Sequence, residues 1–508
     1  MFETSKIPPH IISICQKMRQ ANFDCFLVGG SVRDLILDRE VKDWDLTTNA
    51  TPEQIQAIFP DHFYENDFGT VGIKIGIKDE SDSFYNDIST NFSDVQVVEI
   101  TPYRTESAYS DNRHPDQVIF SDNIEDDLIR RDFTMNAIAL SLKFDNRGQL
   151  LGFDRTLDMF NGQEDIGNKI IRTVGNPDER FQEDSLRLMR ALRFMAELEF
   201  VINNQTMQSL TKNKDLLQNI AKERIKEEFV KILLSNNPSV TIVLCQKIGI
   251  LQYILPELEH GIGVEQNHSH IYDVWEHNLR SLQYAADQKF DLAIRVAALL
   301  HDIGKVTAKR TIKGQITFYG HEVVGARITK QILKDLKFSG DFTDKVVKLV
   351  RWHMFFSDTE QITLSAVRRM IVNVGAENIW DLIKLRECDR IGMGRPSENP
   401  YRLRQYRVMI EQALRDPISV RQLKINGNQI INLLQEPAGP KIGLILNALM
   451  EEVLENPELN TDEHLSKRTV ELSHLNLSEL KNLAESGKNK QKEVEEGELD
   501  KIKQKHRV

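Results

Sequence analysis

The chain of 508 residues has few cysteines and no long apolar run. The four cysteines are scattered and form no CxxC pair, which argues against a disulfide framework or a cysteine zinc site (Cys15, Cys25, Cys245 and Cys388). No apolar stretch approaches the ~18 residues of a membrane span. The first ten residues lack the charged-then-apolar pattern of a signal peptide. We therefore expect a protein of the reducing cytoplasm with no membrane segment.

The chain also lacks an excess of basic residues. Lysine and arginine total 65 against 76 aspartates and glutamates, which gives a formal net charge of −11. A nucleic-acid partner would thus bind to a local basic patch and not to the overall field of the protein. The composition, 40% hydrophobic and 28% charged, is that of an ordinary globular protein. At ~150 residues per domain, the length suggests about three domains.

The pattern of apolar residues changes from strand-like to helical along the chain. Short apolar or alternating runs at 25–30, 73–78 and 95–101 predict strands, with the polar stretch 78–94 as an inserted loop. From about residue 180, apolar residues recur at intervals of three and four, as in helices. This predicts an α/β head followed by a mostly all-α body.

A glycine pair follows the first predicted strand and precedes a predicted helix, SVRDLIL. Gly29 and Gly30 let the backbone approach a bound group closely. The start of the helix offers free N–H groups and the positive end of its dipole to a phosphate, and Arg33 adds a cation. The plainer interpretation is a tight turn before a surface helix.

Two aspartates, Asp43 and Asp45, come soon afterwards, flanked by Trp44 and Leu46 as in a strand. At positions i and i+2 of a strand, both carboxylates face one side, at most ~7 Å apart, and can share divalent metal. Two Mg²⁺ ions held in this way can activate an attacking hydroxyl and neutralise a leaving pyrophosphate. By itself, however, the acid pair is equally compatible with a solvated strand end.

The glycine pair followed by the DxD motif resembles the signature of the DNA polymerase β-like nucleotidyltransferases. Five stretches narrow the resemblance: VKDWDLTTNATPEQI, FGTVGI, VEITPYRTESAYSDNRHPDQVIF, EDDLIRRDFTMNAIAL and EDSLRLMRALRF. In this order they resemble the motifs of class II tRNA nucleotidyltransferases (CCA-adding enzymes) and bacterial poly(A) polymerases, over roughly residues 20–240. The resemblance implies a polymerase β-like head, a nucleotide- and RNA-binding neck, and Mg²⁺-dependent addition of CCA to tRNA from CTP and ATP.

The resemblance also implies roles for single residues. Asp43 and Asp45 would be the catalytic ligands of Mg²⁺, with Glu99 as the candidate for a third carboxylate. Asp132 would be the candidate for ribose recognition. The nucleotide-binding positions would be Gly30, Arg33, Arg131, Asp184, Arg187, Arg190 and Arg193.

Asp184 and Arg187 are three residues apart and so are expected on one helical face. A carboxylate accepts a hydrogen bond from the exocyclic amine of cytosine or adenine, while a guanidinium donates to the adjacent ring nitrogen. Guanine and uracil present the opposite pattern there, so the pair would select CTP and ATP without a template base. The plainer interpretation is an ion pair on a surface helix.

A second set of chemically notable residues lies farther along the chain: His277, His301, Asp302, His321, His353 and Asp389. An adjacent His–Asp pair on an apolar helix favours a metal or a partner, and this ligand mixture suits Mn²⁺, Ni²⁺ or Fe²⁺. The order of His277, His301–Asp302 and Asp389 resembles the metal site of the HD phosphohydrolases. His321 and His353 are candidates for a second ion. A bound metal would supply a hydroxide for phosphoester cleavage, although a purely structural HD fold fits equally well.

These resemblances divide the chain into five predicted segments. They are a nucleotidyltransferase head (1–150), a helical neck (151–260), an HD domain (261–400), a helical C-terminal region (401–475) and a charged, disordered or solvated tail (476–508).

Three rival functions stay open. They are a poly(A) polymerase, an enzyme restricted to adding A or CC, and an HD phosphohydrolase whose head only senses nucleotides. FGTVGI and the HD residues favour CCA addition over poly(A) synthesis, and the intact Asp43 and Asp45 argue against a sensor. The sequence predicts no oligomeric state.

Overall fold

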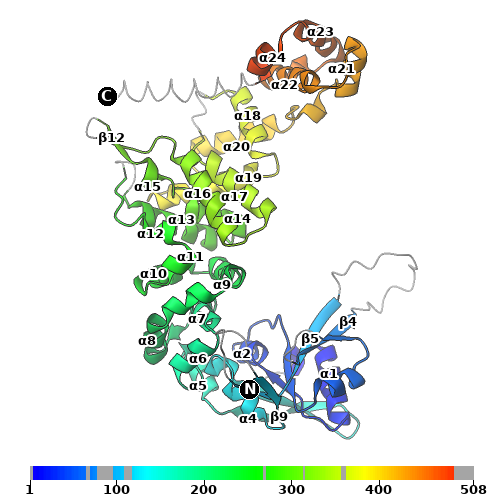
Figure 1. Ribbon diagram of the computed structural model, residues 1–508, viewed down its shortest axis with the longest axis vertical. Helices are drawn as coiled ribbons and strands as arrows, with labels where there is room; N and C mark the ends of the chain where they lie inside the picture. Colours follow the sequence, from blue (N-terminus) through cyan, green and yellow to red (C-terminus); the bar gives the residue numbers. More distant parts are fainter. Residues whose placement is uncertain are drawn as a thin grey trace. The chain divides into compact units, whose positions relative to one another are not determined.

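A computed structural model of the chain describes residues 4–64, 69–76, 95–107, 117–266, 271–312, 315–355 and 362–484 (Figure 1). The chain forms two compact units, Met1–Ile254 and Leu255–Val508. The predicted inserted loop 78–94 lies outside the described residues, as does the predicted tail beyond residue 484. No helix within the described ranges is both long and apolar enough to cross a membrane.

The first unit is built on a mixed seven-stranded sheet in the order β3-β4-β5-β2-β1-β8-β9. The strands are β1 (Phe26–Val28), β2 (Asp45–Thr48), β3 (His62–Tyr64), β4 (Val71–Gly76), β5 (Val95–Pro102), β8 (Ile138–Phe144) and β9 (Leu150–Asp158). β1 is antiparallel to β2 and β8, and β2 is parallel to β5. All of β1 is buried, as its continuous apolar run requires of a central strand. The predicted α/β head is thus confirmed.

Short helices and a hairpin complete the head. The helices are α1 (Pro9–Gln20), α2 (Gly30–Ile36), α3 (Pro52–Ile58) and α4 (Ile124–Ile129). The hairpin pairs β6 (Arg104–Ser107) with β7 (Gln117–Phe120). α1 packs on the head through one apolar stripe, Ile11, Ile14 and Met18, at the three- and four-residue spacing of a helix.

Helices of the neck follow the sheet in the same unit. They are α5 (Gly162–Gly167), α6 (Pro177–Glu183), α7 (Leu186–Leu198), α8 (Asn204–Lys212), α9 (Lys222–Leu234), α10 (Pro238–Lys247) and α11 (Leu251–Ile254), with β10 (Ile170–Ile171) paired to β11 (Val201–Ile202). The predicted single helix through EDSLRLMRALRF is wrong, because α6 ends at Glu183 and α7 starts at Leu186. Asp184 between them is extended, at φ −133° and ψ 103°. Asp184 therefore does not share a helical face with Arg187.

Among the described residues of the second unit, the secondary structure is helical apart from one short hairpin, β12 (Arg310–Ile312) with β13 (Gln315–Thr317). Its first helices are α12 (Pro256–Glu259), α13 (Val274–Asp287), α14 (Leu292–Leu300), α15 (Lys305–Ala308), α16 (His321–Asp335), α17 (Gly340–Trp352), α18 (Leu364–Val374), α19 (Ile379–Gly392) and α20 (Tyr401–Ala413). The predicted mostly all-α body is confirmed. α14, which precedes the His–Asp pair, is buried from Ala293 to Leu300.

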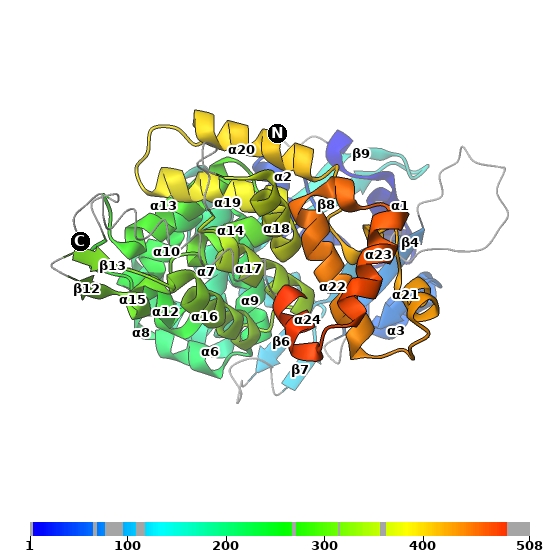
Figure 2. The same ribbon diagram turned by 90° about the horizontal axis from the view of Figure 1, so that it is seen from above.

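Four last helices gather into one bundle (Figure 2). They are α21 (Gly427–Leu434), α22 (Pro440–Glu455), α23 (Asp462–Ser473) and α24 (Leu477–Ala484), and they share a hydrophobic cluster. Leu480 of α24 is fully buried in it, so packed structure continues past the predicted boundary at residue 476. Arg368 of α18 ties to the end of α22 by donating hydrogen bonds to the carbonyls of Leu454 and Glu455 at 2.6 and 3.1 Å.

The two glycines that bound α5 give a matched test of packing between head and neck. At Gly162 an added Cβ would overlap the carbonyl oxygen of Thr134, whereas at Gly167 it would meet nothing within 4 Å. We expect Gly162→Ala to destabilise the first unit by about 1–3 kcal/mol, and Gly167→Ala to be neutral or stabilising by up to about 1 kcal/mol. Urea unfolding curves measure both. Equal effects of the two substitutions would contradict the packing described.

Candidate active site and metal centre

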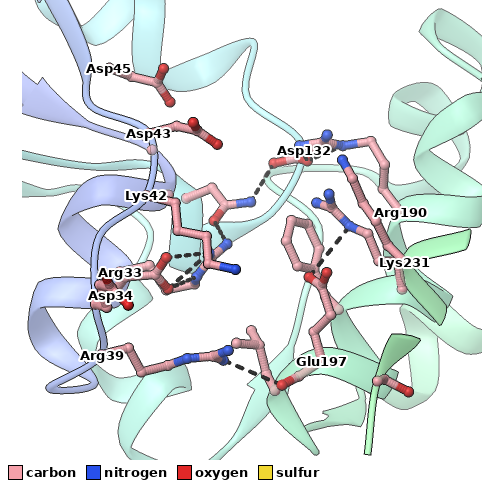
Figure 3. A pocket seen from close by; sticks show the side chains of 18 of the residues that line it. Arg33, Asp34, Arg39, Lys42, Asp43, Asp45, Asp132, Arg190, Glu197 and Lys231 are labelled. Carbon is pink, nitrogen blue, oxygen red and sulfur yellow. Dashed lines mark hydrogen bonds and ion pairs between the residues drawn. The ribbon is translucent and has the colours of Figure 1, made fainter. Parts of the chain in front are cut away.

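A pocket of about 660 Å³ opens in the first unit between the β1–α2 turn and helices α7 and α9 (Figure 3). Seven residues predicted from the sequence line it: Gly30, Arg33, Asp43, Asp45, Arg131, Arg190 and Arg193. Asp132, the ribose candidate, lines it too. Asp184 and Arg187 are not among the described lining residues. The pocket therefore joins the phosphate-binding and metal-binding features predicted for the head to two arginines of the neck.

The turn from β1 into α2 depends on Gly29, whose φ of +74° side chains rarely adopt. A Cβ at this position would lie 3.1 Å from Arg131 Nη1 and 3.2 Å from Asp45 Oδ2. Arg33, one turn into α2, donates through Nε and Nη2 to Asp34 at 2.9 and 3.0 Å, and through Nη1 to Asn136 at 3.0 Å. The turn thus exposes the backbone of two glycines to the pocket, and α2 adds a guanidinium whose position is fixed by hydrogen bonds.

Asp43 and Asp45 face the pocket from the side opposite Arg190 and Lys231 (Figure 3). The prediction that both acids lie on a strand is wrong for Asp43, because β2 begins at Asp45. Burial raises the pKa of Asp45, and the charge of Asp43 raises it further while Arg131 acts in the opposite direction. A carboxylate pair with this excess of negative charge fits a divalent cation.

Glu99, the candidate third carboxylate, lies on the strand beside Asp45. The two residues are partners in the parallel register of β2 and β5. Side chains of directly paired residues project from the same face of a sheet. The tertiary structure thus brings Glu99 next to the acid pair, from a segment more than fifty residues away in the chain.

Asp132 holds the neck arginine Arg190. Its Oδ2 accepts from Arg190 Nε and Nη2 at 2.8 and 2.6 Å, while its Oδ1 accepts from Asn136 Nδ2 at 3.0 Å and Phe133 N at 2.8 Å. Burial alone would raise the pKa of Asp132, but Arg190 and these hydrogen bonds lower it strongly. The ionised carboxylate therefore fixes Arg190 against the head.

Asp184 and Arg187 are each engaged by other groups. Asp184 accepts from Leu186 N at 3.1 Å and pairs with Arg224 of α9 at 3.4 Å. Arg187 Nη1 pairs with Glu183 at 2.6 Å and donates to the carbonyl of Arg180 at 3.0 Å. Its Nη2 donates to the carbonyl of Arg130 at 2.9 Å. In this arrangement Arg187 links α6, α7 and the head. Arg224 was not predicted from the sequence, because nothing in the residues around Arg224 indicates a contact with Asp184.

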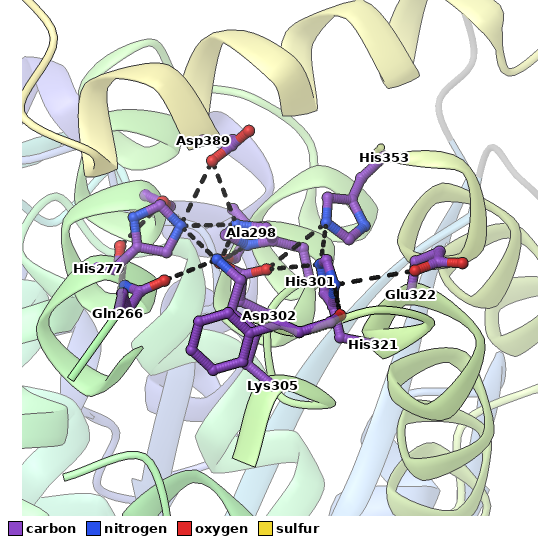
Figure 4. A network of polar contacts seen from close by, with 12 residues as sticks. Gln266, His277, Ala298, His301, Asp302, Lys305, His321, Glu322, His353 and Asp389 are labelled. Atoms are coloured by element: carbon purple, nitrogen blue, oxygen red, sulfur yellow. Dashed lines mark hydrogen bonds and ion pairs between the residues drawn. The ribbon is translucent and has the colours of Figure 1, made fainter. Parts of the chain in front are cut away.

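The second unit brings six predicted residues together into two groups, His277–His301–Asp389 and Asp302–His321–His353 (Figure 4). Within each group the ligand atoms lie within 4.8 Å of one another, and every member is buried. Five separate segments supply them: α13, the end of α14, the start of α16, the end of α17 and α19. Asp302 connects the groups, with Oδ2 3.0 Å from His277 Nε2 and Oδ1 3.3 Å from His321 Nε2.

The histidine rings are oriented as metal ligands require. The Nδ1 atoms of His301, His321 and His353 lie 2.9, 2.8 and 2.7 Å from the backbone carbonyls of Ala298, Phe318 and Val350. An Nδ1–H that donates to a carbonyl leaves a lone pair on Nε2. The Nε2 atoms face one another at 2.8 Å between His277 and His301, and at 3.3 Å between His321 and His353. Facing lone pairs repel unless a cation or proton lies between them.

The charges of this centre also favour a bound cation. Burial lowers the pKa of His277, but Asp302 and Asp389 outweigh it and raise the value to about 9. Burial lowers the pKa of His353 to about 4, which keeps that ring neutral. The residues therefore fit a metal centre with Asp302 as the candidate bridging ligand. Lys305 Nζ, 2.5 Å from Asp302 Oδ2, was missed from the sequence although it follows the His–Asp pair by one helical turn.

Three family models match successive parts of the chain. The model described as "Poly A polymerase head domain" matches residues 25–172. The model described as "Probable RNA and SrmB- binding site of polymerase A" matches residues 199–262, and the model of the HD domain matches residues 274–381.

Proteins similar to this chain carry the name CCA-adding enzyme. The one from Lactobacillus helveticus is 42% identical over 235 residues, which are 46% of this chain and 52% of that protein. The one from Staphylococcus epidermidis is 30% identical over 454 residues, 89% of this chain and 95% of that protein. The chain thus spans about half the length of the first relative and nearly all of the second. The crystal structure of the Bacillus stearothermophilus CCA-adding enzyme in complex with CTP matches with a TM-score of 0.65 at 26% identity, covering 92% of this chain and 98% of that one.

Metal binding to the histidine–aspartate centre predicts a thermal shift. A ligand that binds only the folded state at about 100 times its dissociation constant stabilises it by about 2.7 kcal/mol. We therefore expect Mn²⁺ or Ni²⁺ to raise the unfolding temperature of the metal-stripped protein by a few degrees. Asp302→Asn should remove the part of the shift that comes from this centre, whereas His260→Ala, at an exposed histidine of the same unit, should retain the full shift. An equal shift in all three proteins would exclude this centre as the binding site.

Proposed function

The chain belongs to the family of CCA-adding enzymes, and we propose that its head and neck add CMP, CMP and AMP to the 3′ end of tRNA. The nucleotide substrates are CTP and ATP, and each addition releases pyrophosphate. The observation that carries the proposal is the pocket where the β1–α2 turn, the acid pair and the arginines of head and neck meet. Phosphate, divalent metal and nucleotide thus have binding groups within one cavity.

The residues of this pocket divide the work of nucleotidyl transfer. Asp43 and Asp45 hold Mg²⁺, which when bound activates the terminal hydroxyl of the RNA and neutralises the pyrophosphate. Glu99 is the third carboxylate of the same site. The backbone at Gly29 and Gly30 and the guanidinium of Arg33 hold the triphosphate.

The remaining arginines of the pocket bind the rest of the nucleotide. Arg131 lies beside the glycine turn, and Arg190 is held in place by Asp132. Asp132, the candidate for ribose recognition, would have to share with a ribose hydroxyl an oxygen that already accepts hydrogen bonds. Arg193 completes the set from the next turn of α7.

Base selection rests on Asp184 and Arg187 in this proposal. Asp184 accepts from the exocyclic amine of cytosine or adenine, which requires it to exchange its 3.4 Å pairing with Arg224 for the base. Arg187 donates to the ring nitrogen, which requires it to give up its contact with Glu183. Nucleotide binding is therefore coupled to a rearrangement of ion pairs where α6 meets α7.

Names of the relatives favour CCA addition over poly(A) synthesis. The family model of the head is shared with poly(A) polymerases and does not separate the two. Between the two restricted enzymes, one that adds only A is the harder rival to exclude. Restriction to CC usually involves the loss of a loop segment near TPYRTESAYSDNRHP, and that segment is complete in the sequence. A cytoplasmic location is part of this proposal, and the four scattered cysteines are compatible with a reducing compartment.

A second function, metal-dependent phosphohydrolysis, is proposed for the histidine–aspartate centre. It is supported by the facing Nε2 atoms and by the position of Asp302 between the two groups. A transition metal such as Mn²⁺ or Ni²⁺ suits these ligands and supplies a hydroxide when bound. Lys305, which is paired with Asp302, is the candidate cation for a substrate phosphate.

The direct test incubates the purified protein with tRNA that lacks its 3′ CCA and with each labelled nucleotide in turn. We expect incorporation of CMP, then of AMP only after both cytidines. AMP incorporation onto any RNA end would support the poly(A) rival, and no incorporation would leave the head as a nucleotide sensor.

Reciprocal variants should separate the two chemistries. Asp43→Ala removes a metal ligand, so we expect at least about a hundredfold loss of nucleotide addition with hydrolysis of 2′,3′-cyclic phosphate unchanged. Asp302→Ala should do the reverse. Circular dichroism controls for folding, and a parallel loss of both activities in either folded variant would refute the two-site arrangement.

Selection by Asp184 predicts a loss of discrimination that exceeds the loss of rate. A good bidentate contact is worth ~1–3 kcal/mol against the wrong base. Asp184→Ala should therefore lower the preference for CTP and ATP over UTP and GTP by roughly ten- to hundredfold. Values of kcat/KM for all four nucleotides measure it. Unchanged selectivity, or an equal loss for all four, would assign Asp184 a structural role only.

A further inference from the structure

One buried phenylalanine, Phe194 of α7, lies at the wall of the pocket and is only 2% exposed. Three guanidiniums surround its ring. The Cζ atoms of Arg33, Arg190 and Arg193 lie 5.0, 5.4 and 4.1 Å from the ring centroid. The same three arginines line the pocket. One aromatic side chain is thus shared by cations from α2 of the head and α7 of the neck.

Each of these three guanidiniums also pairs with a carboxylate, and Arg33 donates in addition to an amide oxygen. Arg33 is bonded to Asp34 and Asn136, Arg190 to Asp132, and Arg193 to Glu228 at 3.1 Å. These groups offset part of the repulsion among the three like charges. All three guanidiniums also lie within 5.4 Å of the same ring centroid.

A phenyl ring is suited to this position near three cations, and an aliphatic side chain is not. The ring face is negative because of its quadrupole, and a nearby cation gains about 0.5–2 kcal/mol from it, more where water is excluded. Phe133, next to Asp132 in the chain, packs its ring at 5.6 Å and 87° to that of Phe194. This edge contact leaves the geometry of the ring fixed from the head side.

We propose that Phe194 is a positioning residue for the nucleotide, which lets three arginines converge on the triphosphate and ribose by binding their cations on one ring. It touches neither metal nor reacting atoms and acts through Arg33, Arg190 and Arg193. The inference rests on the proposed nucleotide site, and it adds a determinant of nucleotide affinity that is apolar and was absent from the sequence-based site.

The test varies the ring electrostatics at constant shape. Phe194 is replaced by phenylalanines with one, two or three ring fluorines, which weaken the quadrupole stepwise, and KM and kcat for CTP are measured on tRNA lacking CCA. We expect log KM to rise steadily with fluorine number, to about tenfold in total, with kcat changed much less. Phe194→Leu should reach the same KM or exceed it. Phe200→Leu, at another buried phenylalanine of the same unit, should leave KM unchanged.

The outcomes separate the inference from the function on which it rests. A KM that does not respond to fluorination while Phe194→Leu only lowers the unfolding temperature would overturn the positioning role and reduce Phe194 to packing. Wild-type protein that incorporates no CMP would refute the proposed function itself, and with it this inference. A graded KM in protein of unchanged unfolding temperature supports the role, because packing does not follow the quadrupole.

Discussion

The ion pair between Asp132 and Arg190 connects the two halves of the proposed nucleotide site. Asp132 precedes the last strands of the head sheet, and Arg190 lies on the first long helix of the neck. Asp132 is buried, whereas the side chain of Arg190 is 32% exposed. Loss of Arg190 would leave a buried carboxylate uncompensated, which is destabilising. Arg190 in turn lies over Phe194, so the pair also sets the position of the arginine cluster. The pair is thus one of the contacts that hold the pocket together across the junction of head and neck, beside the bond from Arg187 to the carbonyl of Arg130.

The pocket of the first unit and the histidine–aspartate centre of the second unit are suited to ligands of opposite charge. In the pocket, like-charged arginines are gathered for an anionic ligand, and carboxylates and an aromatic ring offset their repulsion. In the histidine–aspartate centre, lone pairs and carboxylates are gathered for a cation, and backbone carbonyls fix the rings. Each arrangement gathers groups of one sign around a central space, so each favours a ligand of the opposite charge. The pocket favours an anion, and the histidine–aspartate centre favours a cation. The sites lie in different compact units, which is consistent with two separable chemistries.

Short sequence motifs were enough to predict much of the fold and many of the residues of the site. The glycine pair, the strand runs and the helical periodicity predicted the α/β head and the helical body, because these features are set by local backbone preference. The order of the histidines and aspartates likewise predicted a shared centre. Two local predictions failed for a physical reason. The strand at DWD starts only at Asp45, and the helix at EDSLRL is broken at Asp184, because tertiary contacts decide where an element ends.

By itself, the sequence determined which chemical groups this protein has and which local elements present them. These are a glycine turn, an acid pair, several arginines and an adjacent His–Asp pair with further histidines and an aspartate around it. Tertiary structure decided which of these groups meet. It placed Glu99 beside Asp45 through strand register, paired Asp184 with Arg224 instead of Arg187, and set Phe194 among three arginines. None of these contacts follows from spacing along the chain. They depend on how strands and helices far apart in sequence pack to bury apolar surface, and the polar side chains take the partners that this packing brings within reach.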